Sequence, residues 1–287
     1  MLPINRYLAP IVTRYLSKIG LGKYVFPYVS EITLLSKNAN FNINHPVGKY
    51  RLERFGGEKD YLLHFLINLT PESCVLDVGA SLGLYSIFSA KIAHQVISIE
   101  PDISIYSELS ANFKLNSLHN YILVNQALGN ENTSLKIYTN GANANSPSFT
   151  DLANGLSRSV SVPVIKGDKL LTQLAKTSIH RYPDIYKIDV EGYEMHVLQG
   201  LAKTLNSPNR PTHIFLEIHP KFLKAFKVDK KEIYTFLTDR GYQINFQKIR
   251  DNEELCHFTY YQNINNPPSN LFSTPKRPPK VDTSKTL

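Results

Sequence analysis

Apolar and polar residues follow one another along most of the chain in a pattern that predicts helices and short strands in alternation. Apolar runs at 74–78, 96–100 and 121–125 have the length of strands. Between them, apolar residues recur every three or four positions, as on one face of a helix. Strands that are apolar on both faces belong in a parallel sheet covered by helices on each side. The order therefore predicts a doubly wound α/β fold.

The same alternation continues into the second half of the chain. The expected helices are 58–69, 84–93, 102–116, 194–205 and one that a capping box opens at Asp229 and that ends at Gly241. Further strands are expected at 184–190 and 213–218. Residues 242–248 and 255–262 alternate well enough to predict an antiparallel hairpin at the C-terminal end of a mostly parallel sheet.

Residues 139–159 interrupt this pattern. They are rich in Asn, Ser and Gly and lie between two strand-like runs, 134–138 and 160–165. A loop of this length in a compact domain is typically either functional or disordered. Its position after the third strand would place it over the carboxyl edge of the sheet, where ligands bind in such folds. A substrate lid and plain disorder are the two alternatives.

The two ends of the chain differ from its middle. Residues 5–20 have apolar positions at helical spacing with basic residues among them. This predicts a helix that packs on the domain or on a partner chain in a homo-oligomer, or one that makes peripheral contact with an anionic membrane. The Pro-rich stretch 265–287 predicts a disordered tail. We therefore expect an N-terminal helical accessory segment at 1–57, a main domain at 58–264 and a tail at 265–287.

Composition adds few constraints on this picture. Hydrophobic residues make up 42% and charged residues 20% of the 287, as in soluble globular proteins. Two cysteines are too few for a disulfide framework. The first residues lack the pattern of a secretory signal, and no stretch has the roughly 18 consecutive apolar residues of a membrane-spanning helix. A cytoplasmic protein is expected.

The net charge of +8 is concentrated at the ends of the chain. Residues 1–24 carry four basic residues and no acid, and residues 265–287 carry four basic residues against one acid. The long middle is therefore nearly neutral, whereas a nucleic-acid-binding face usually needs a basic stripe on the folded body. No specific nucleic-acid partner is expected.

A glycine loop, Asp77-Val78-Gly79-Ala80-Ser81-Leu82-Gly83, joins the first of these buried strands to a helix. Glycines allow the backbone to approach a ligand, and the start of the helix offers free N–H groups. The dinucleotide fingerprint does not fit, because Ser81 stands where its second glycine should be. A phosphate-binding Walker loop does not fit either, because Leu84 follows Gly83. With these two nucleotide-binding motifs excluded, the pattern of the loop is Asp-x-Gly-x-x-x-Gly.

Glu100 ends the next strand, where a carboxylate can accept hydrogen bonds from both ribose hydroxyls. S-adenosylmethionine (SAM) has no phosphates, so its loop tolerates an acid that faces the cofactor's ammonium group, and Asp77 supplies one. Together these acids favour SAM over a nicotinamide cofactor. Asn125 and Gln126 are placed either to read the adenine or to cap the turn before Gly129. The cofactor-binding candidates are Asp77, Gly79, Ala80, Ser81, Gly83, Glu100, Pro101, Asn125, Gln126 and Ala127.

At this point the sequence resembles the FkbM family of SAM-dependent methyltransferases. The resemblance runs from about Glu58 to Gly241 and is carried by DVGASLGLYSIFSAK, ISIEP, NQALG, YKIDVEGYEMHVLQG and IFLEIHP, in that order. It implies a class I methyltransferase (Rossmann-like) fold and O-methylation of sugars and other natural-product hydroxyls. The family usually has Asn where this chain has Ser81, and serine can still form a hydrogen bond.

Polar residues end two later strands, where a plain core would not need them. Lys187, Asp189 and Glu191 alternate at the end of one strand, and Glu217 and His219 at the end of the next. Neighbouring parallel strands would bring both sets to the edge that carries the glycine loop. Lys187 is expected to pair with one of the acids.

Methyl transfer to a hydroxyl requires alignment of the acceptor and removal of its proton. The catalytic candidates are Asp189, Glu191 and His219, acting as general base. As an alternative, Asp189, Glu191, Glu217 and His219 could hold Mg²⁺ and lower the pKa of the acceptor. A structural role for His219, with its ring nitrogens satisfied at the end of the strand, is the other possibility. No tight ligand motif is present, so no metal is assigned.

Three functions compete. The first is a SAM-dependent methyltransferase that O-methylates a small-molecule or glycan hydroxyl. The second is methylation of RNA, DNA or protein on nitrogen. Many amino-directed nucleic-acid enzymes carry an Asn/Asp-Pro-Pro-aromatic motif at a strand end that here reads Ile188-Asp189-Val190-Glu191. The third is a non-catalytic binding protein that retains the SAM fold, against which the intact Asp77 and Glu100 weigh. The sequence favours the first.

Overall fold

A seven-stranded sheet forms the centre of the computed structural model, which describes residues 26–139, 148–149, 158–179, 181–250 and 253–261. The strand order is β11-β12-β10-β9-β3-β4-β5. Five neighbouring strands run parallel: β3 (Cys74–Val78), β4 (Gln95–Ile99), β5 (Tyr121–Val124), β9 (Ile185–Ile188) and β10 (His213–Ile218). β11 (Tyr242–Arg250) and β12 (Glu253–Tyr260) form an antiparallel hairpin, and β12 is also antiparallel to β10. The predicted mostly parallel sheet with a C-terminal antiparallel hairpin is confirmed.

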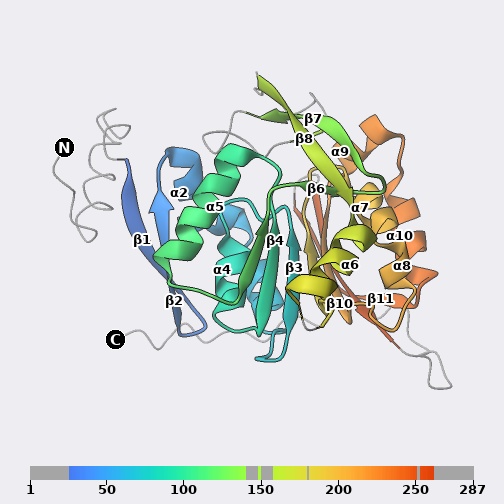
Figure 1. Ribbon diagram of the computed structural model, residues 1–287, viewed down its shortest axis with the longest axis horizontal. Helices are drawn as coiled ribbons and strands as arrows, with labels where there is room; N and C mark the ends of the chain where they lie inside the picture. Colours follow the sequence, from blue (N-terminus) through green and yellow to red (C-terminus); the bar gives the residue numbers. More distant parts are fainter. Residues whose placement is uncertain (1–25, 140–147, 150–157, 180, 251–252, 262–287) are drawn as a thin grey trace.

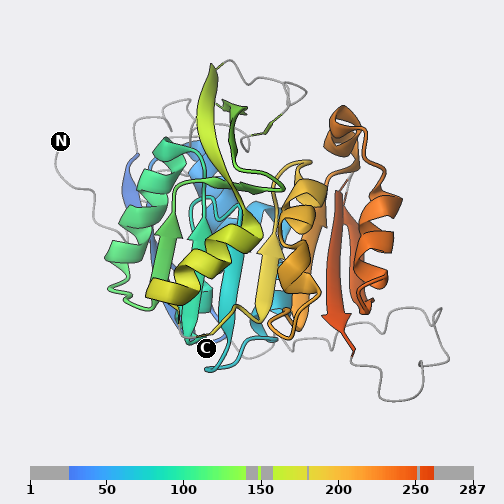
Figure 2. The ribbon, with the colours of Figure 1, turned by 45° about the vertical axis from the view of Figure 1, so that its right-hand side comes forward.

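Helices cover both faces of this sheet because successive strand residues point to opposite sides. Val75 packs in a core with α3 (Lys59–Leu66), α4 (Leu84–Ala90) and α5 (Ile103–Leu115). Leu76, the next residue, packs in a second core on the other face. The helices of that face are α6 (Gly167–Thr177), α7 (Glu194–Gly200), α8 (Ala202–Leu205) and α10 (Lys230–Thr238). Short α9 (Pro220–Leu223) and η3 (Lys224–Phe226) follow β10. Figures 1 and 2 show this layered, doubly wound arrangement.

The prediction of a helical segment at 1–57 is wrong for residues 28–43. They form an antiparallel hairpin of β1 (Tyr28–Leu34) and β2 (Lys37–Ile43), followed by α2 (Pro46–Glu53) and the short η2 (Phe55–Gly57). Every second residue of β2 from Ala39 onward is buried, which is the period of a strand. The hairpin lies beside α5 (Figure 1), and the side chain of Asn112 accepts a hydrogen bond from the Asn42 backbone N–H at 2.9 Å. The expected helix at 5–20 and the tail at 265–287 lie outside the described residues.

A second, three-stranded sheet stands at the carboxyl edge of the central sheet, at the top of Figure 2. It has the order β6 (Ala127–Gly129), β8 (Arg158–Lys166), β7 (Thr133–Thr139), and β7 and β8 contain the two predicted strand-like runs. Most of the loop 139–159 lies outside the described residues, so its role as a lid stays a prediction. Across the described ranges, none of the helices has the length and apolar character needed to span a membrane.

Candidate active site

The strand order reverses between β3 and β9, and a cavity lies where the loops after these strands separate. The loops after β3, β4 and β9 all contribute to its wall, together with α2, α4 and the small sheet. Polar and charged side chains on the wall are Arg51, Glu58, Ser81, Tyr85, Glu100, Lys187, Asp189 and Glu191. Chain segments far apart in the sequence therefore form one cavity, as the strand topology predicts.

Backbone hydrogen bonds fix Glu100 against the glycine loop. The two carboxylate oxygens of Glu100 accept hydrogen bonds from the backbone N–H groups of Ser81 and Asp102, each at 3.0 Å. Burial raises the pKa of Glu100 to about 7, although these two hydrogen bonds act in the opposite direction. The carboxyl group lines the cavity and keeps further oxygen lone pairs for a ligand. It is thus held rigidly at the end of β4.

The glycine loop touches the neighbouring strand end through Gly79. This residue has a φ of 84°, and a Cβ atom added to it would lie 1.8 Å from the Asp189 backbone oxygen. Only glycine therefore fits between β3 and β9 here. The contact joins the loop to the segment that carries the candidate catalytic acids.

Six of the ten predicted cofactor-binding residues line the cavity: Gly79, Ala80, Ser81, Glu100, Pro101 and Ala127. Gly83, Asn125 and Gln126 do not. Gly83 is the N-cap of α4. The side-chain amide of Asn125 donates to the backbone oxygens of Glu100 and Pro101, at 2.8 and 3.0 Å, and so supports the turn after β4. Its amide nitrogen is thus committed to the protein backbone.

Asp77 also lies off the cavity wall, fully buried beneath the glycine loop. Its carboxylate accepts a 2.6 Å hydrogen bond from the Ser86 hydroxyl and lies 3.6 Å from the Lys187 ammonium. The prediction that the Asp77 carboxylate faces the ammonium group of the cofactor is therefore not what the structure shows. Asp77 faces α4 and β9 instead, and it supports the loop from behind.

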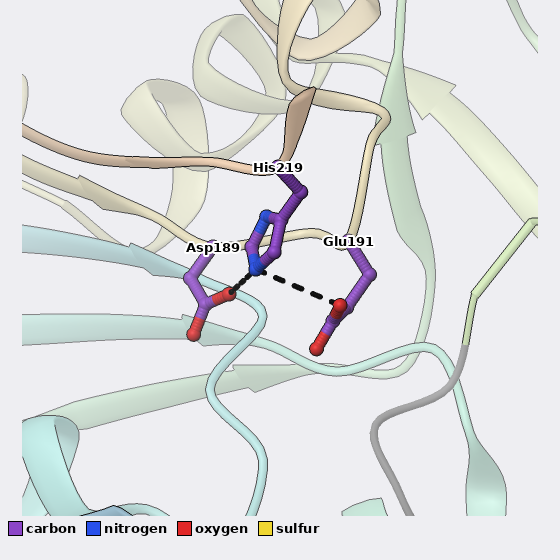
Figure 3. A group of neighbouring side chains, drawn as sticks. All are labelled: Asp189, Glu191 and His219. Atoms are coloured by element: carbon purple, nitrogen blue, oxygen red, sulfur yellow. Dashed lines mark ion pairs between the residues drawn. The ribbon is translucent and has the colours of Figure 1, made fainter. Parts of the chain in front are cut away.

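Asp189 and Glu191 lie on the cavity wall, and the imidazole ring of His219 lies between their carboxylates (Figure 3). The His219 Nε2 atom is 3.9 Å from Asp189 Oδ1 and 3.6 Å from Glu191 Oε2. Glu217 Oε1 lies 3.7 Å from the same nitrogen. The structure thus brings together all three predicted catalytic residues, but His219 is 2% exposed and does not itself line the cavity.

Glu194, which sequence reasoning missed, fixes the orientation of His219. Its Oε1 atom lies 2.7 Å from His219 Nδ1 and accepts a 2.9 Å hydrogen bond from the Gly192 backbone N–H. Burial alone would lower the pKa of His219, but Glu191, Glu194 and Asp189 outweigh it and raise this pKa well above its usual value. When His219 is protonated, the N–H group at Nε2 therefore points toward the carboxylates of Asp189 and Glu191.

The prediction that Lys187 pairs with an acid of the cluster is confirmed. Its Nζ atom lies 3.1 Å from Asp189 Oδ2 and 3.6 Å from Asp77 Oδ1. Burial would raise the pKa of Asp189, but Lys187 and His219 hold this pKa below its usual value. Asp189 is thus an ionised carboxylate across the neutral pH range.

The cavity also includes residues from before the glycine loop that sequence reasoning did not identify. Arg51, from α2, donates a 3.1 Å hydrogen bond from Nη1 to the Ser81 hydroxyl. Glu58 accepts hydrogen bonds from Tyr85 at 3.2 Å and from Arg250 at 3.1 Å. No local motif marks these side chains, because the fold alone brings them to the carboxyl edge of the sheet.

The donor atoms of this cluster are also of the kind that bind divalent cations. One ligand atom from each of Asp189, Glu191 and His219 lies within 4.8 Å of the others, and the same holds for Glu217, His219 and Glu253. Carboxylate oxygens and an imidazole nitrogen suit Mg²⁺ or a first-row metal ion. Metal-assisted and general-base activation of an acceptor therefore use the same residues.

Comparison with known proteins gives a family match and one curated relative. The model of the FkbM methyltransferase domain matches residues 77–244. The hexuronic acid methyltransferase AglP of Haloferax volcanii is 22% identical over 228 residues, which cover 79% of this chain and 87% of the relative.

Two solved structures show the degree of structural similarity. The FkbM methyltransferase of Methylobacillus flagellatus is 18% identical, with a TM-score of 0.47 over 70% of this chain and 48% of the other. The SAM-bound magnesium protoporphyrin IX methyltransferase of Synechocystis is 14% identical, with a TM-score of 0.45 over 91% of this chain and all of the other.

Proposed function

This chain belongs to the FkbM methyltransferase family, and from that premise we propose that it transfers the methyl group of SAM to an oxygen atom of a sugar, glycan or related small natural product. The observation that carries the proposal is a single cavity lined both by the glycine loop with Glu100 and by Asp189 with Glu191. The similarity to a hexuronic acid methyltransferase supports a sugar-like acceptor. We assign this activity to residues 58–264, with α2 contributing to the cavity wall.

The residues present fit SAM as cofactor. Bound SAM supplies an electrophilic methyl group on a sulfonium. Glu100 would accept hydrogen bonds from the ribose hydroxyls, because this residue lines the cavity and its carboxylate is already oriented by two backbone N–H groups. Gly79, Ala80 and Ser81 line the same cavity. Asp77 acts indirectly, through its contacts with Ser86 and Lys187.

On the acceptor side, we assign proton removal to the carboxylates of Asp189 and Glu191. They line the cavity, whereas His219 lies behind them and carries a proton at neutral pH because of its raised pKa. A carboxylate oxygen of either acid would orient the acceptor hydroxyl and accept its proton as the methyl group is transferred. His219 stabilises the pair, and Glu194 holds His219 in place.

Two alternatives use other chemistry. A divalent cation held by Asp189, Glu191 and His219 would lower the pKa of the acceptor in place of a general base. Methylation of RNA or protein would need a different acceptor surface, and the nearly neutral middle of the chain does not favour a nucleic-acid partner.

The test is a methyl-transfer screen with SAM carrying a radiolabelled methyl group. The acceptors are neutral oligosaccharides, uronic-acid-containing oligosaccharides, total RNA and a protein extract, each with and without a chelator. Label in a saccharide fraction is the expected result, and its resistance to mild alkali separates a methyl ether from a methyl ester. Labelling of RNA or protein alone would overturn the proposed acceptor class. Loss of transfer in chelator, restored by Mg²⁺, would favour the metal alternative.

A further inference from the structure

We propose that Arg51 is the carboxylate-binding residue of the cavity and that its ligand is the methionine carboxylate of SAM. This inference rests on the proposed function, because it takes SAM as the cofactor. It assigns part of the cofactor site to α2, which precedes both the glycine loop and the segment that the family model matches.

Arg51 lies close to the glycine loop and to Glu100 through Ser81. Arg51 lines the cavity, and its Nη1 atom donates to the Ser81 hydroxyl at 3.1 Å. The backbone N–H of Ser81 donates to Glu100 at 3.0 Å. One residue of the glycine loop therefore contacts both Glu100, which we assign to the ribose, and Arg51. A nucleoside bound at Glu100 that carries an amino-acid chain can reach a guanidinium held on the same loop.

Arg51 lies among several carboxylates of the cavity wall. The acids that act on Arg51 are Glu191, Asp189, Glu100 and Glu58, and burial lowers the pKa of Arg51 while these carboxylates raise it. The other basic residue that lines the described part of the wall is Lys187, whose ammonium group lies 3.1 Å from Asp189 and 3.6 Å from Asp77. A ligand carboxylate beside Arg51 would thus pair with a guanidinium on a wall whose other charged side chains are mostly acids.

The guanidinium of Arg51 suits a carboxylate ligand, and α2 anchors it. A guanidinium presents a planar fork of N–H donors that matches a carboxylate, and charge-assisted pairs of this kind are strong. The neighbouring residue Leu52 is fully buried in the core, and His45 caps the start of α2 through a 2.9 Å hydrogen bond from the Gly48 N–H. The helix thus holds Arg51 in place before any ligand binds.

The test is calorimetric and compares two ligands that differ at the methionine end. S-adenosylhomocysteine carries the carboxylate, whereas 5′-methylthioadenosine keeps the nucleoside and the thioether but lacks both the carboxylate and the ammonium. R51Q should weaken the binding of S-adenosylhomocysteine about 10- to 100-fold. The affinity for methylthioadenosine should stay within about twofold of the wild-type value, since the nucleoside contacts remain. R51K keeps the positive charge but lacks the planar set of N–H donors. Its affinity for S-adenosylhomocysteine should lie between those of R51Q and the wild type.

Arg54 offers a matched control, because it ends the same helix and is exposed. R54Q should bind both ligands as the wild type does. Equal weakening of both ligands by R51Q, or no weakening, would overturn the inference. So would unchanged cofactor affinity with a raised KM for an acidic acceptor, which would assign the carboxylate to the acceptor. If wild-type protein binds neither SAM nor S-adenosylhomocysteine, the proposed function itself fails.

Discussion

The two sides of the cavity are built in different ways. On the glycine-loop side, backbone N–H groups hold the cavity-lining acid Glu100, and the loop and this acid lie within residues 77–102. On the other side, charged side chains hold one another: Asp189 by Lys187, and His219 by Glu194. The first side is a rigid surface suited to binding, and the second is a network of ionised groups suited to moving a proton. Substitutions on the glycine-loop side should therefore change the affinity for SAM, and substitutions on the other side should change kcat.

The largest effect is expected at the point where the two sides touch. Gly79→Ala places a methyl group into the Asp189 backbone oxygen and forces alanine into a φ of 84°. The strain and overpacking together should cost about 2 to 5 kcal/mol of unfolding free energy. SAM binding should be lost with it. Chemical denaturation and calorimetry measure the two losses.

Gly241→Ala is the matched control for this substitution. Gly241 has nearly the same φ, 85°, but the nearest atom to an added Cβ is a Tyr260 ring carbon at 3.1 Å. This variant should lose only about 1 to 2 kcal/mol and keep SAM binding. If both variants behave alike, the close contact between Gly79 and Asp189 does not join the two sides.

Asp189→Asn should separate chemistry from binding. It keeps the shape of the side chain but removes the carboxylate that we assign to proton transfer, so kcat should fall about 10²- to 10⁴-fold. The affinity for SAM should stay within a few-fold, because Glu100 and the glycine loop are unchanged. Steady-state kinetics with a saccharide acceptor and calorimetry with SAM provide the two readouts. A large loss of SAM affinity with unchanged kcat would contradict the division between the two sides.

The pH dependence of SAM binding should report on Glu100. Its pKa of about 7 implies that the carboxylate loses its charge below that pH, so SAM affinity should fall about tenfold per pH unit there and level off above it. Folding stability runs the other way: the pKa is raised above the usual 4.5, so ionisation of Glu100 destabilises the unliganded fold as the pH rises through this window. Glu100→Gln should bind SAM about 10- to 100-fold more weakly at pH 8 and lose the pH dependence. A wild-type affinity that is constant from pH 6 to 8 would contradict the assignment.

The smallest effect is expected at Glu194. Glu194→Gln keeps a hydrogen-bond acceptor for His219 Nδ1 but removes a charge that raises the pKa of His219. We expect kcat at pH 7 to fall by less than about tenfold. Stability from protonated His219 is fully present below pH 6.5 and is lost as the pH rises toward the raised pKa of the folded protein, so in this variant the total loss should be smaller and complete at a lower pH. Thermal unfolding measured from pH 6 to 10 tests this, and identical profiles for variant and wild type would exclude the proposed role of Glu194.

The same difference explains what could be predicted from sequence. The strands, the glycine loop and Glu100 follow from contiguous patterns, because a buried strand and a tight turn have local signatures. The meeting of Asp189, Glu191 and His219 also followed, since neighbouring parallel strands end at one edge. The orientation of Asp77 could not be predicted from sequence. Its side chain faces α4 rather than the cavity because of its contacts with Ser86 and Lys187.

The features missed depend on contacts between distant segments or on weak patterns. Glu194 contacts His219 across 25 residues, and Arg51 reaches Ser81 across 30. Neither pair has a spacing that a motif would mark. The β1–β2 hairpin was missed although Ala39, Phe41 and Ile43 alternate with polar residues as in a strand, because this run is short. The amphipathic helix α6, which follows β8 directly, was also not predicted.

One measurement tests the division of the cavity most directly: calorimetric titration of SAM into the wild-type protein, Glu100→Ala and Asp189→Asn under the same conditions at pH 8. The wild type should bind SAM with one site per chain. Glu100→Ala should lose at least about tenfold in affinity, and Asp189→Asn should bind as the wild type does while losing methyl transfer. Absence of SAM binding to the wild type, or equal losses in the two variants, would contradict the account.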